Sequence, residues 1–90
     1  MEIGTAIREI RKSQGIKQKE LASKISISFV SLCAIEKNKA FPKRDTLNKI
    51  AEALNKPLSF ILIHSISEED IPKEKREVFK AVIEPLKALL

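Results

Sequence analysis

The sequence predicts an all-α protein with five short helices and a sixth, longer helix at its C-terminal end. Apolar residues recur at the spacing of a helical face along most of the 90 residues. The chain is 43% apolar and holds only two Gly, a composition that favours helices. It has four Phe and no Trp or Tyr, so the core has to come mainly from Ile, Leu, Val and Ala.

The first helix is predicted from an apolar face near the N-terminal end. Ile3, Ala6, Ile7 and Ile10 recur at i, i+3, i+4 and i+7. This pattern ends in the polar sequence KSQG, whose Gly15 is a typical helix stop. We therefore expect a helix of about three turns.

Two shorter helices follow. Residues 18–24 form a predicted helix of barely two turns with its apolar residues on one face. These residues are Leu21, Ala22 and Ile25. Ser28 is a good N-cap for the next helix, because its hydroxyl accepts a hydrogen bond from a backbone N–H of the next turn. This third helix extends to about Ile35, with Leu32 on its inner face.

The fourth helix is predicted from about Arg44 to Leu54 and the fifth directly after it. Asn55 ends the fourth helix, since Asn tolerates the left-handed cap position. Pro57 fits the first turn of the fifth helix, because it has no N–H to lose there. The residues expected to face the core are Leu47, Ile50, Ala51 and Leu54 in the fourth helix and Leu58, Ile61 and Leu62 in the fifth.

The last segment, from Pro72 to Leu90, is predicted as one amphipathic helix that Pro85 kinks or shortens. Its apolar stripe consists of Val78, Phe79, Val82, Ile83, Leu86, Leu89 and Leu90. Because the preceding residues already supply a core, we expect this helix to form a homodimer. The dimer contacts are expected from Val78, Phe79, Val82, Ile83 and Leu86. The alternative is that the helix folds back over its own domain.

Charge divides the chain into two parts. Residues 1–64 hold twelve Lys and Arg against six Asp and Glu, a net charge of +6, whereas residues 65–90 have a net charge of −1. The sequence HSISEEDIPKE between them interrupts the apolar periodicity. We expect a basic domain at 1–64 and, at 65–90, a linker with the C-terminal helix.

The composition disfavours several classes of protein. Cys33 is the only Cys, so no intramolecular disulfide can form, which indicates a reducing compartment and hence the cytoplasm. The longest apolar run, residues 60–63, is far short of the roughly 20 residues of a membrane span. One His and one Cys are too few for a tetrahedral zinc site, and no pair of acids suggests catalysis. We expect no metal, no cofactor and no enzymatic activity.

The second and third predicted helices have the features of a helix-turn-helix. Ala22 is small where the two helices would cross, and Ile27 is apolar inside the turn. Residues 3–62 resemble the phage-repressor (Xre/Cro) helix-turn-helix family. The positions that carry this resemblance are Gln18, Leu21-Ala22, Ser28, Leu32, Ile35-Glu36 and the Pro-containing loop 37–43.

The resemblance implies a five-helix, lambda-repressor-like domain that binds double-stranded DNA. By position, Gln18 binds a phosphate, the third helix reads base edges in the major groove, and the following loop contacts the backbone. The resemblance also implies an ion pair between Arg11 and Glu36. The residues expected to contact DNA are Gln18, Ser28, Phe29, Val30, Cys33, Ala34, Lys37, Lys39, Lys43 and Arg44.

Physical chemistry supports the same phosphate contacts. Gln18 lies at a predicted helix N-terminus, whose N–H groups and dipole favour an anion. Lys37, Lys39, Lys43 and Arg44 fall within eight residues, directly after the helix expected to enter the groove. A loop this basic can follow a phosphate backbone.

The chain departs from the family pattern where Gly is usual. Ser26 stands in the turn, Asn38 after the third helix and Asn55 after the fourth. Asn adopts the left-handed conformation readily, whereas Ser does so less well. We therefore expect left-handed backbone at these positions, with some strain at Ser26.

The recognition positions depart further, because Phe29, Val30, Cys33 and Ala34 offer no bidentate hydrogen bond to a base. Either these side chains contact thymine methyl groups while DNA shape contributes the remaining specificity, or the apolar face binds protein. The first explanation is favoured because the flanking phosphate contacts are complete. Phe41 in the basic loop is expected to pack on the third helix, with insertion into DNA as the alternative.

Together these features predict a small dimeric regulator of transcription that binds double-stranded DNA sequence-specifically. Its recognition helix, at about residues 28–37, would lie in the major groove, and its two half-sites would be about 34 Å apart. The alternative is a protein-interaction module, such as the antitoxin of a toxin–antitoxin pair, with a protein partner in place of DNA.

Overall fold

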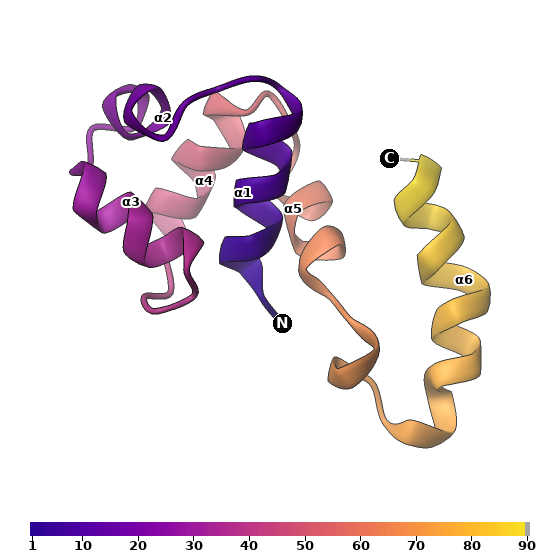
Figure 1. Cartoon of the computed structure of the whole chain (residues 1–90). Helices are drawn as coiled ribbons and strands as arrows, with labels where there is room; N and C mark the ends of the chain where they lie inside the picture. Colours follow the sequence, from indigo (N-terminus) through magenta and orange to yellow (C-terminus); the bar gives the residue numbers. More distant parts are fainter. Residues whose placement is uncertain (90) are drawn as a thin grey trace.

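The computed structural model describes residues 1–89, and all the regular secondary structure in this part of the chain is helical, as predicted. Leu90, the last member of the predicted C-terminal stripe, lies outside the described residues. Figure 1 shows the N-terminal helices gathered into one domain and the C-terminal helix standing beside it. The helices are α1 (Ile3–Ser13), α2 (Gln18–Lys24), α3 (Phe29–Glu36), α4 (Arg44–Ala53), α5 (Leu58–Ser65) and α6 (Arg76–Leu89), with 3₁₀ turns at Glu68–Asp70 and Lys73–Lys75.

The core lies where the first five helices meet, and α1 packs against both α3 and α5. Each of these five helices contributes one side chain with no exposed surface, and the residue that caps the end of α4 contributes another. These side chains are Ile7, Leu21, Leu32, Ile50, Leu54 and Ile61. Burying a side chain of this size stabilises the fold by about 1.5–3 kcal/mol, so the predicted apolar faces hold this domain together.

The N-terminal turn of α1 approaches the C-terminal end of α3 so closely that only Gly fits. A Cβ atom at Gly4 would lie 1.9 Å from the carbonyl oxygen of Ile35. The backbone N–H of Gly4 donates to Oδ1 of Asn38 at 2.9 Å, and Nδ2 of Asn38 donates to Oγ1 of Thr5 at 2.9 Å. These contacts fasten the C-terminal end of α3 to α1.

Left-handed backbone follows four of the helices: at Gly15 after α1, where φ is 73°, and at three non-Gly residues in positions where the family that the sequence resembles usually has Gly. The φ angles are 59° at Ser26 after α2, 61° at Asn38 after α3 and 55° at Asn55 after α4. Asn accommodates this conformation through its short polar side chain, but Ser does so less readily. The predicted cap at Asn55 is confirmed, and the strain falls on Ser26 in the helix-turn-helix turn.

The C-terminal helix differs from the prediction at two points. The α-helix begins at Arg76 rather than Pro72, because Lys73–Lys75 form a tighter 3₁₀ turn, a common way for a helix to start. Pro85 lies inside α6, yet the helix continues to Leu89. Of the two expected effects, a kink or a shortening, the shortening is wrong, since the missing N–H removes one backbone hydrogen bond without ending the helix.

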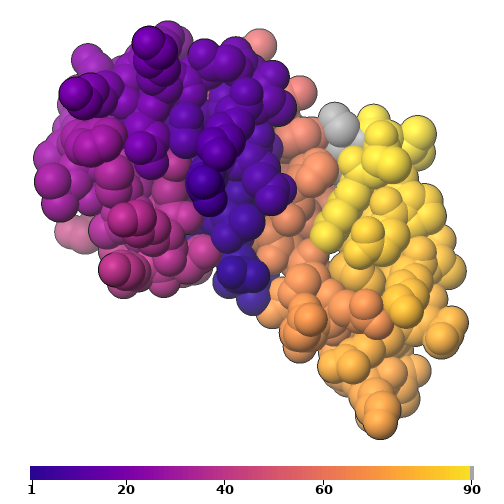
Figure 2. Space-filling view, in the orientation of Figure 1, coloured from indigo at the N-terminus to yellow at the C-terminus, as the bar shows by residue number. Residues whose placement is uncertain are grey.

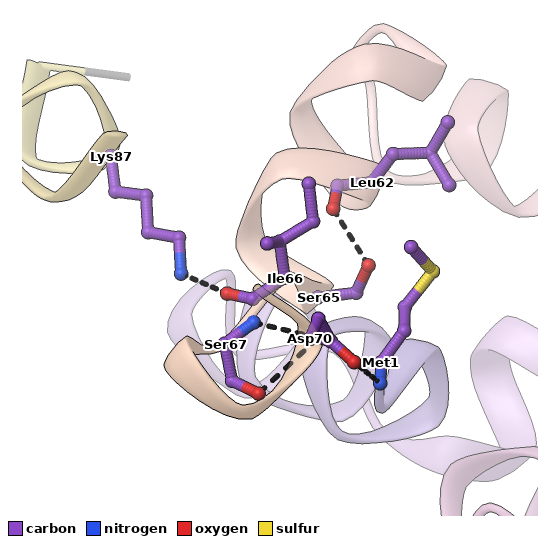
Figure 3. A network of polar contacts seen from close by, with 7 residues as sticks. All are labelled: Met1, Leu62, Ser65, Ile66, Ser67, Asp70 and Lys87. Atoms are coloured by element: carbon purple, nitrogen blue, oxygen red, sulfur yellow. Dashed lines mark hydrogen bonds and ion pairs between the residues drawn. The ribbon is translucent and has the colours of Figure 1, made fainter. Parts of the chain in front are cut away.

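One edge of α6 packs against its own chain, as the fold-back alternative describes. Phe79 is only 4% exposed, and Nζ of Lys87 lies 5.4 Å from the centre of its ring. Lys87 also donates a hydrogen bond to the carbonyl oxygen of Ile66, next to the end of α5 (Figure 3). In Figure 2 the C-terminal part of the chain, which includes α6, lies against the surface of α5.

The linker is held to the N-terminal end of the chain. Asp70 accepts hydrogen bonds from the Met1 amino group and, at 2.9 Å, from the backbone N–H of Ser67 (Figure 3). The hydrogen bond from the Met1 amino group, followed by the one from the Ser67 backbone, holds the pKa of the Asp70 carboxyl below its ordinary value. The backbone N–H of Glu2 donates to the carbonyl oxygen of Ser65 at 3.2 Å.

The other edge of the α6 stripe faces solvent. Val78 is 63% exposed, Val82 57%, Leu86 37% and Leu89 84%, whereas Ile83 is half-buried. The residues predicted to dimerise therefore divide between an inner edge that contacts α5 and an outer edge without cover in the single chain. Among the described residues, no helix is both long and apolar enough to cross a bilayer.

Candidate nucleic-acid interface

Helices α2 and α3 and the turn between them have the bounds that the sequence predicts. Oγ of Ser28 accepts a hydrogen bond from the backbone N–H of Ser31 at 3.0 Å, so the predicted N-cap is confirmed. In the turn, the backbone N–H of Ile27 donates to the carbonyl oxygen of Ala22 at 3.0 Å, and the Ile27 side chain packs against the core. The turn therefore fixes the direction in which α3 leaves α2.

A buried ion pair joins α1 to the end of α3. Nε and Nη2 of Arg11 donate to the two carboxylate oxygens of Glu36 at 2.8 Å and 3.0 Å, a bidentate arrangement. Nη1 of Arg11 donates to the carbonyl oxygen of Ile16 at 2.7 Å. Arg11 is 6% and Glu36 4% exposed, so the pair is shielded from solvent.

Gln18 is attached to the same pair. Its Nε2 donates to Oε1 of Glu36 at 2.9 Å, so a side chain at the start of α2 is positioned by the end of α3. A side-chain amide carries two N–H donors and one acceptor, which leaves capacity for a second partner. Gln18 lines a hollow of about 480 Å³ together with Arg8, Lys37 and Asn38. Two cations and two amides therefore line one polar depression beside α3, together with Glu36, whose carboxylate is paired with Arg11.

The outward side of α3 is apolar, as the sequence indicates. Val30 is 75% and Phe29 41% exposed, while Cys33 and Ala34 are half-buried. The hydroxyl of Ser28, which caps the helix, also donates to Oγ of Ser31 at 2.8 Å.

The loop after α3 presents its basic residues to solvent. Lys37, Lys39, Lys43 and Arg44 are all exposed. The backbone N–H groups of Lys39 and Ala40 both donate to the carbonyl oxygen of Ala34, at 2.9 Å and 3.2 Å, so the loop begins by folding back on α3.

Phe41 at the tip of this loop is 71% exposed. The loop packs on α3 as expected, through the hydrogen bonds to Ala34, while Phe41 itself stays largely exposed. Phe41 does line a hollow of about 450 Å³ together with Val30, Ala34 and Lys43.

Comparison with known proteins agrees with this geometry. Residues 4–64 match the family model of a helix-turn-helix domain. The chain belongs to the helix-turn-helix family of phage-repressor type. This family consists of DNA-binding transcriptional regulators. No solved structure matches the chain significantly.

Two relatives of this helix-turn-helix protein have names that agree with the family. It is 33% identical to the immunity repressor protein of Bacillus phage phi105 over 81 residues, which are 90% of this chain and 54% of that protein. The chain thus spans about half the length of that repressor. It is 36% identical over 52 residues to an uncharacterized helix-turn-helix-type transcriptional regulator of Methanothermobacter thermautotrophicus, which covers 58% of this chain and 75% of the relative.

Two residues of this helix-turn-helix surface were missed by sequence reasoning. Arg8 lines the hollow beside Gln18, and Nζ of Lys19 lies 5.8 Å from the ring centre of Phe29. Arg8 precedes Arg11 by three residues, so helical spacing alone places the two on neighbouring positions of α1. The sequence does not indicate that Arg8 lies beside the start of α2 and the end of α3, because that placement depends on how the helices pack.

Proposed function

We propose that this helix-turn-helix protein binds double-stranded DNA sequence-specifically, with α3 in the major groove, and regulates transcription in the cytoplasm. The observation that carries the proposal is that basic residues line two hollows, each of which is also lined by residues of α3. Arg8, Gln18 and Lys37 line one hollow, and Lys43 lines the other.

The roles of the residues divide into positioning and reading. Gln18, Arg8 and Lys37 contact one stretch of phosphates, while Lys39, Lys43 and Arg44 contact another. Phosphate contacts fix the orientation of a protein on the duplex, and side chains at the base edges supply the sequence preference. Phe29, Val30, Cys33 and Ala34 lie at the reading positions of α3. Ser28 contributes by capping α3 at its groove-facing end.

The test is selection of bound fragments from a pool of random duplexes, followed by fluorescence anisotropy over a range of salt concentrations. We expect one enriched sequence motif and a steep loss of affinity with salt, with a slope of about −0.9 for each phosphate contacted. Failure to enrich any motif, together with salt-independent binding, would contradict the proposal.

The outer edge of α6 supports a homodimer as the form that binds DNA. Val78, Val82, Leu86 and Leu89 recur at helical spacing and are exposed. A second copy of the same stripe covers them in a two-fold arrangement, while Phe79 and Ile83 remain with their own chain. Two linked binding modules raise the overall affinity by about 10² to 10⁴-fold, which suits half-sites about 34 Å apart.

A charge on the outer edge tests the dimer. Val82→Glu is expected to give a folded monomer, because Val82 is already 57% exposed in the single chain. Ala88→Glu adds the same charge at an exposed position about 120° around α6 from Val82 and is the matched control. Sedimentation equilibrium measures the association, and circular dichroism measures the folding. A full-length chain that is monomeric at micromolar concentration, even with the selected duplex, would rule the dimer out.

The exposed apolar face of α3 favours one alternative, a protein-interaction module such as an antitoxin. Apolar surface of this kind is typical of protein contacts. The distinguishing result is a second polypeptide that co-purifies in equal amounts while the complex and the free chain have no affinity for DNA. We favour DNA because the apolar face is bordered by lysines.

A further inference from the structure

We propose that the hollow between α3 and the following loop reads the C5-methyl groups of pyrimidines, thymine above all, as its main source of sequence preference. The hollow has a volume of about 450 Å³. Its lining is mostly apolar and includes Val30, Ala34 and Phe41, with the hydroxyl residues Ser31 and Thr46 beside them. This inference rests on the proposed function and names what the DNA surface recognises. It predicts a preference carried by methyl groups rather than by side-chain hydrogen bonds.

The first step is the lack of long polar side chains on the outward side of α3. The hydroxyl of Ser28 donates to Oγ of Ser31 at 2.8 Å and also caps the helix, so the short hydroxyl of Ser31 is the donor that this side of α3 keeps. Cys33 and Ala34, the next residues along this side, are half-buried. The usual readers of a base edge are Arg, Lys, Asn and Gln, which form bidentate hydrogen bonds. None of these residue types lies on α3.

The second step is the exposure of apolar side chains around a concave surface. Val30 is 75% and Phe41 71% exposed, although they come from different segments of the chain. The loop brings them together, because the backbone N–H groups of Lys39 and Ala40 are bonded to Ala34. A hollow of this volume has room for several methyl groups.

The third step is the charge around the hollow. Lys43 lines it, and Lys39 is exposed in the same loop. Over residues 29–44, Glu36 is the single acid, and it is buried against Arg11; the exposed Asp45 follows in the first turn of α4. The occupant therefore combines an anionic border with an apolar interior. The major groove has this pattern where thymine methyl groups project between the phosphate backbones.

The experiment uses the full chain and the duplex obtained by selection, in versions that differ only in methyl groups. Replacing thymine by deoxyuridine removes the C5-methyl and keeps the base pair. We expect about a fourfold loss of affinity for each contacted methyl, the equilibrium equivalent of burying one methylene. Replacing a contacted thymine by 5-methylcytosine is expected to retain more affinity than replacing it by cytosine.

Variants assign the effect to the hollow. Val30→Ala and Phe41→Ala are expected to bring the thymine-to-uracil affinity ratio toward one, because both side chains are exposed and their loss does not open the core. Lys39→Ala is the matched control. It is expected to weaken binding to both duplexes equally and leave the ratio unchanged.

The outcomes separate this inference from the proposed function. Specific binding to the selected duplex with equal affinity for its thymine and uracil forms would overturn the methyl reading and leave DNA binding intact. A ratio that survives both Val30→Ala and Phe41→Ala would overturn the assignment to this hollow. Absence of specific DNA binding, with a protein partner held on the same face, would overturn both.

Discussion

Loss of the Glu36 carboxylate is expected to be strongly destabilising. Glu36 accepts hydrogen bonds from Nε and Nη2 of Arg11 and from Nε2 of Gln18, all within 3.0 Å. Glu36→Ala leaves the Arg11 guanidinium buried, with the carbonyl oxygen of Ile16 as its remaining recorded partner. Breaking a buried pair in this way costs about 3–5 kcal/mol, which is a large share of the roughly 5–15 kcal/mol that holds a protein folded.

The magnitude is measurable by thermal and urea denaturation followed by circular dichroism. A loss of 1 kcal/mol lowers the Tm of a domain this size by about 4–8 °C, so Glu36→Ala is expected to lower it by about 12 °C or more. Glu20→Ala is the control. It removes an exposed 3.9 Å pair with Lys24, and such pairs contribute about 0–1 kcal/mol.

Double variants test the reasoning itself. Arg11→Ala combined with Glu36→Ala is expected to lose less stability than the two single variants added together, because each single variant strands a charge. Arg11→Met with Glu36→Leu is expected to recover most of the stability, since apolar residues of similar volume replace buried ion pairs at little cost. Strict additivity, within about 0.5 kcal/mol, would refute a coupled buried pair.

Three further predictions concern other parts of the molecule. Gly4→Ala is expected to cost at least about 1–3 kcal/mol, since its Cβ meets backbone rather than a side chain that can move; an unchanged Tm would contradict this contact. Lys39→Ala or Lys43→Ala is expected to reduce the slope of log affinity against log salt concentration by about one unit without changing the selected motif, whereas Lys73→Ala in the linker is expected to leave both unchanged. The carboxylate of Asp70 has a lowered pKa, so it is ionised and holds the linker at pH values above the ordinary Asp pKa, and the contact is lost as the pH falls through the lowered pKa. Amide NMR shifts of the untagged chain are expected to titrate there and not to do so in Asp70→Asn.

Much of the domain followed from the sequence because its signals are local. The bounds of α2 follow from two adjacent patterns, an apolar face and a turn, and the start of α3 follows from the capping chemistry of Ser28. The left-handed positions at Asn38 and Asn55 were predictable because few residue types tolerate them. The apolar character of the recognition face was likewise readable from side-chain type alone.

The features that could not be predicted from the sequence depend on packing between distant segments. The requirement for Gly at position 4 arises from an approach of α1 to α3 that no local pattern encodes. The same holds for Arg8 beside Gln18, and for the division of the α6 stripe, where Phe79 is buried and Val78 is exposed. Neighbouring residues of one apolar stripe are equivalent in the sequence, and only tertiary contacts decide which of them is covered.

The most direct test of DNA binding through α3 is an NMR titration of the ¹⁵N-labelled full chain with the selected duplex. Chemical-shift changes are expected to concentrate in the first turn of α2, along α3 and in the loop 37–44, with Arg8 as the one clear response from α1. Shifts confined to α6, or spread evenly over the five-helix domain, would contradict a DNA interface centred on α3.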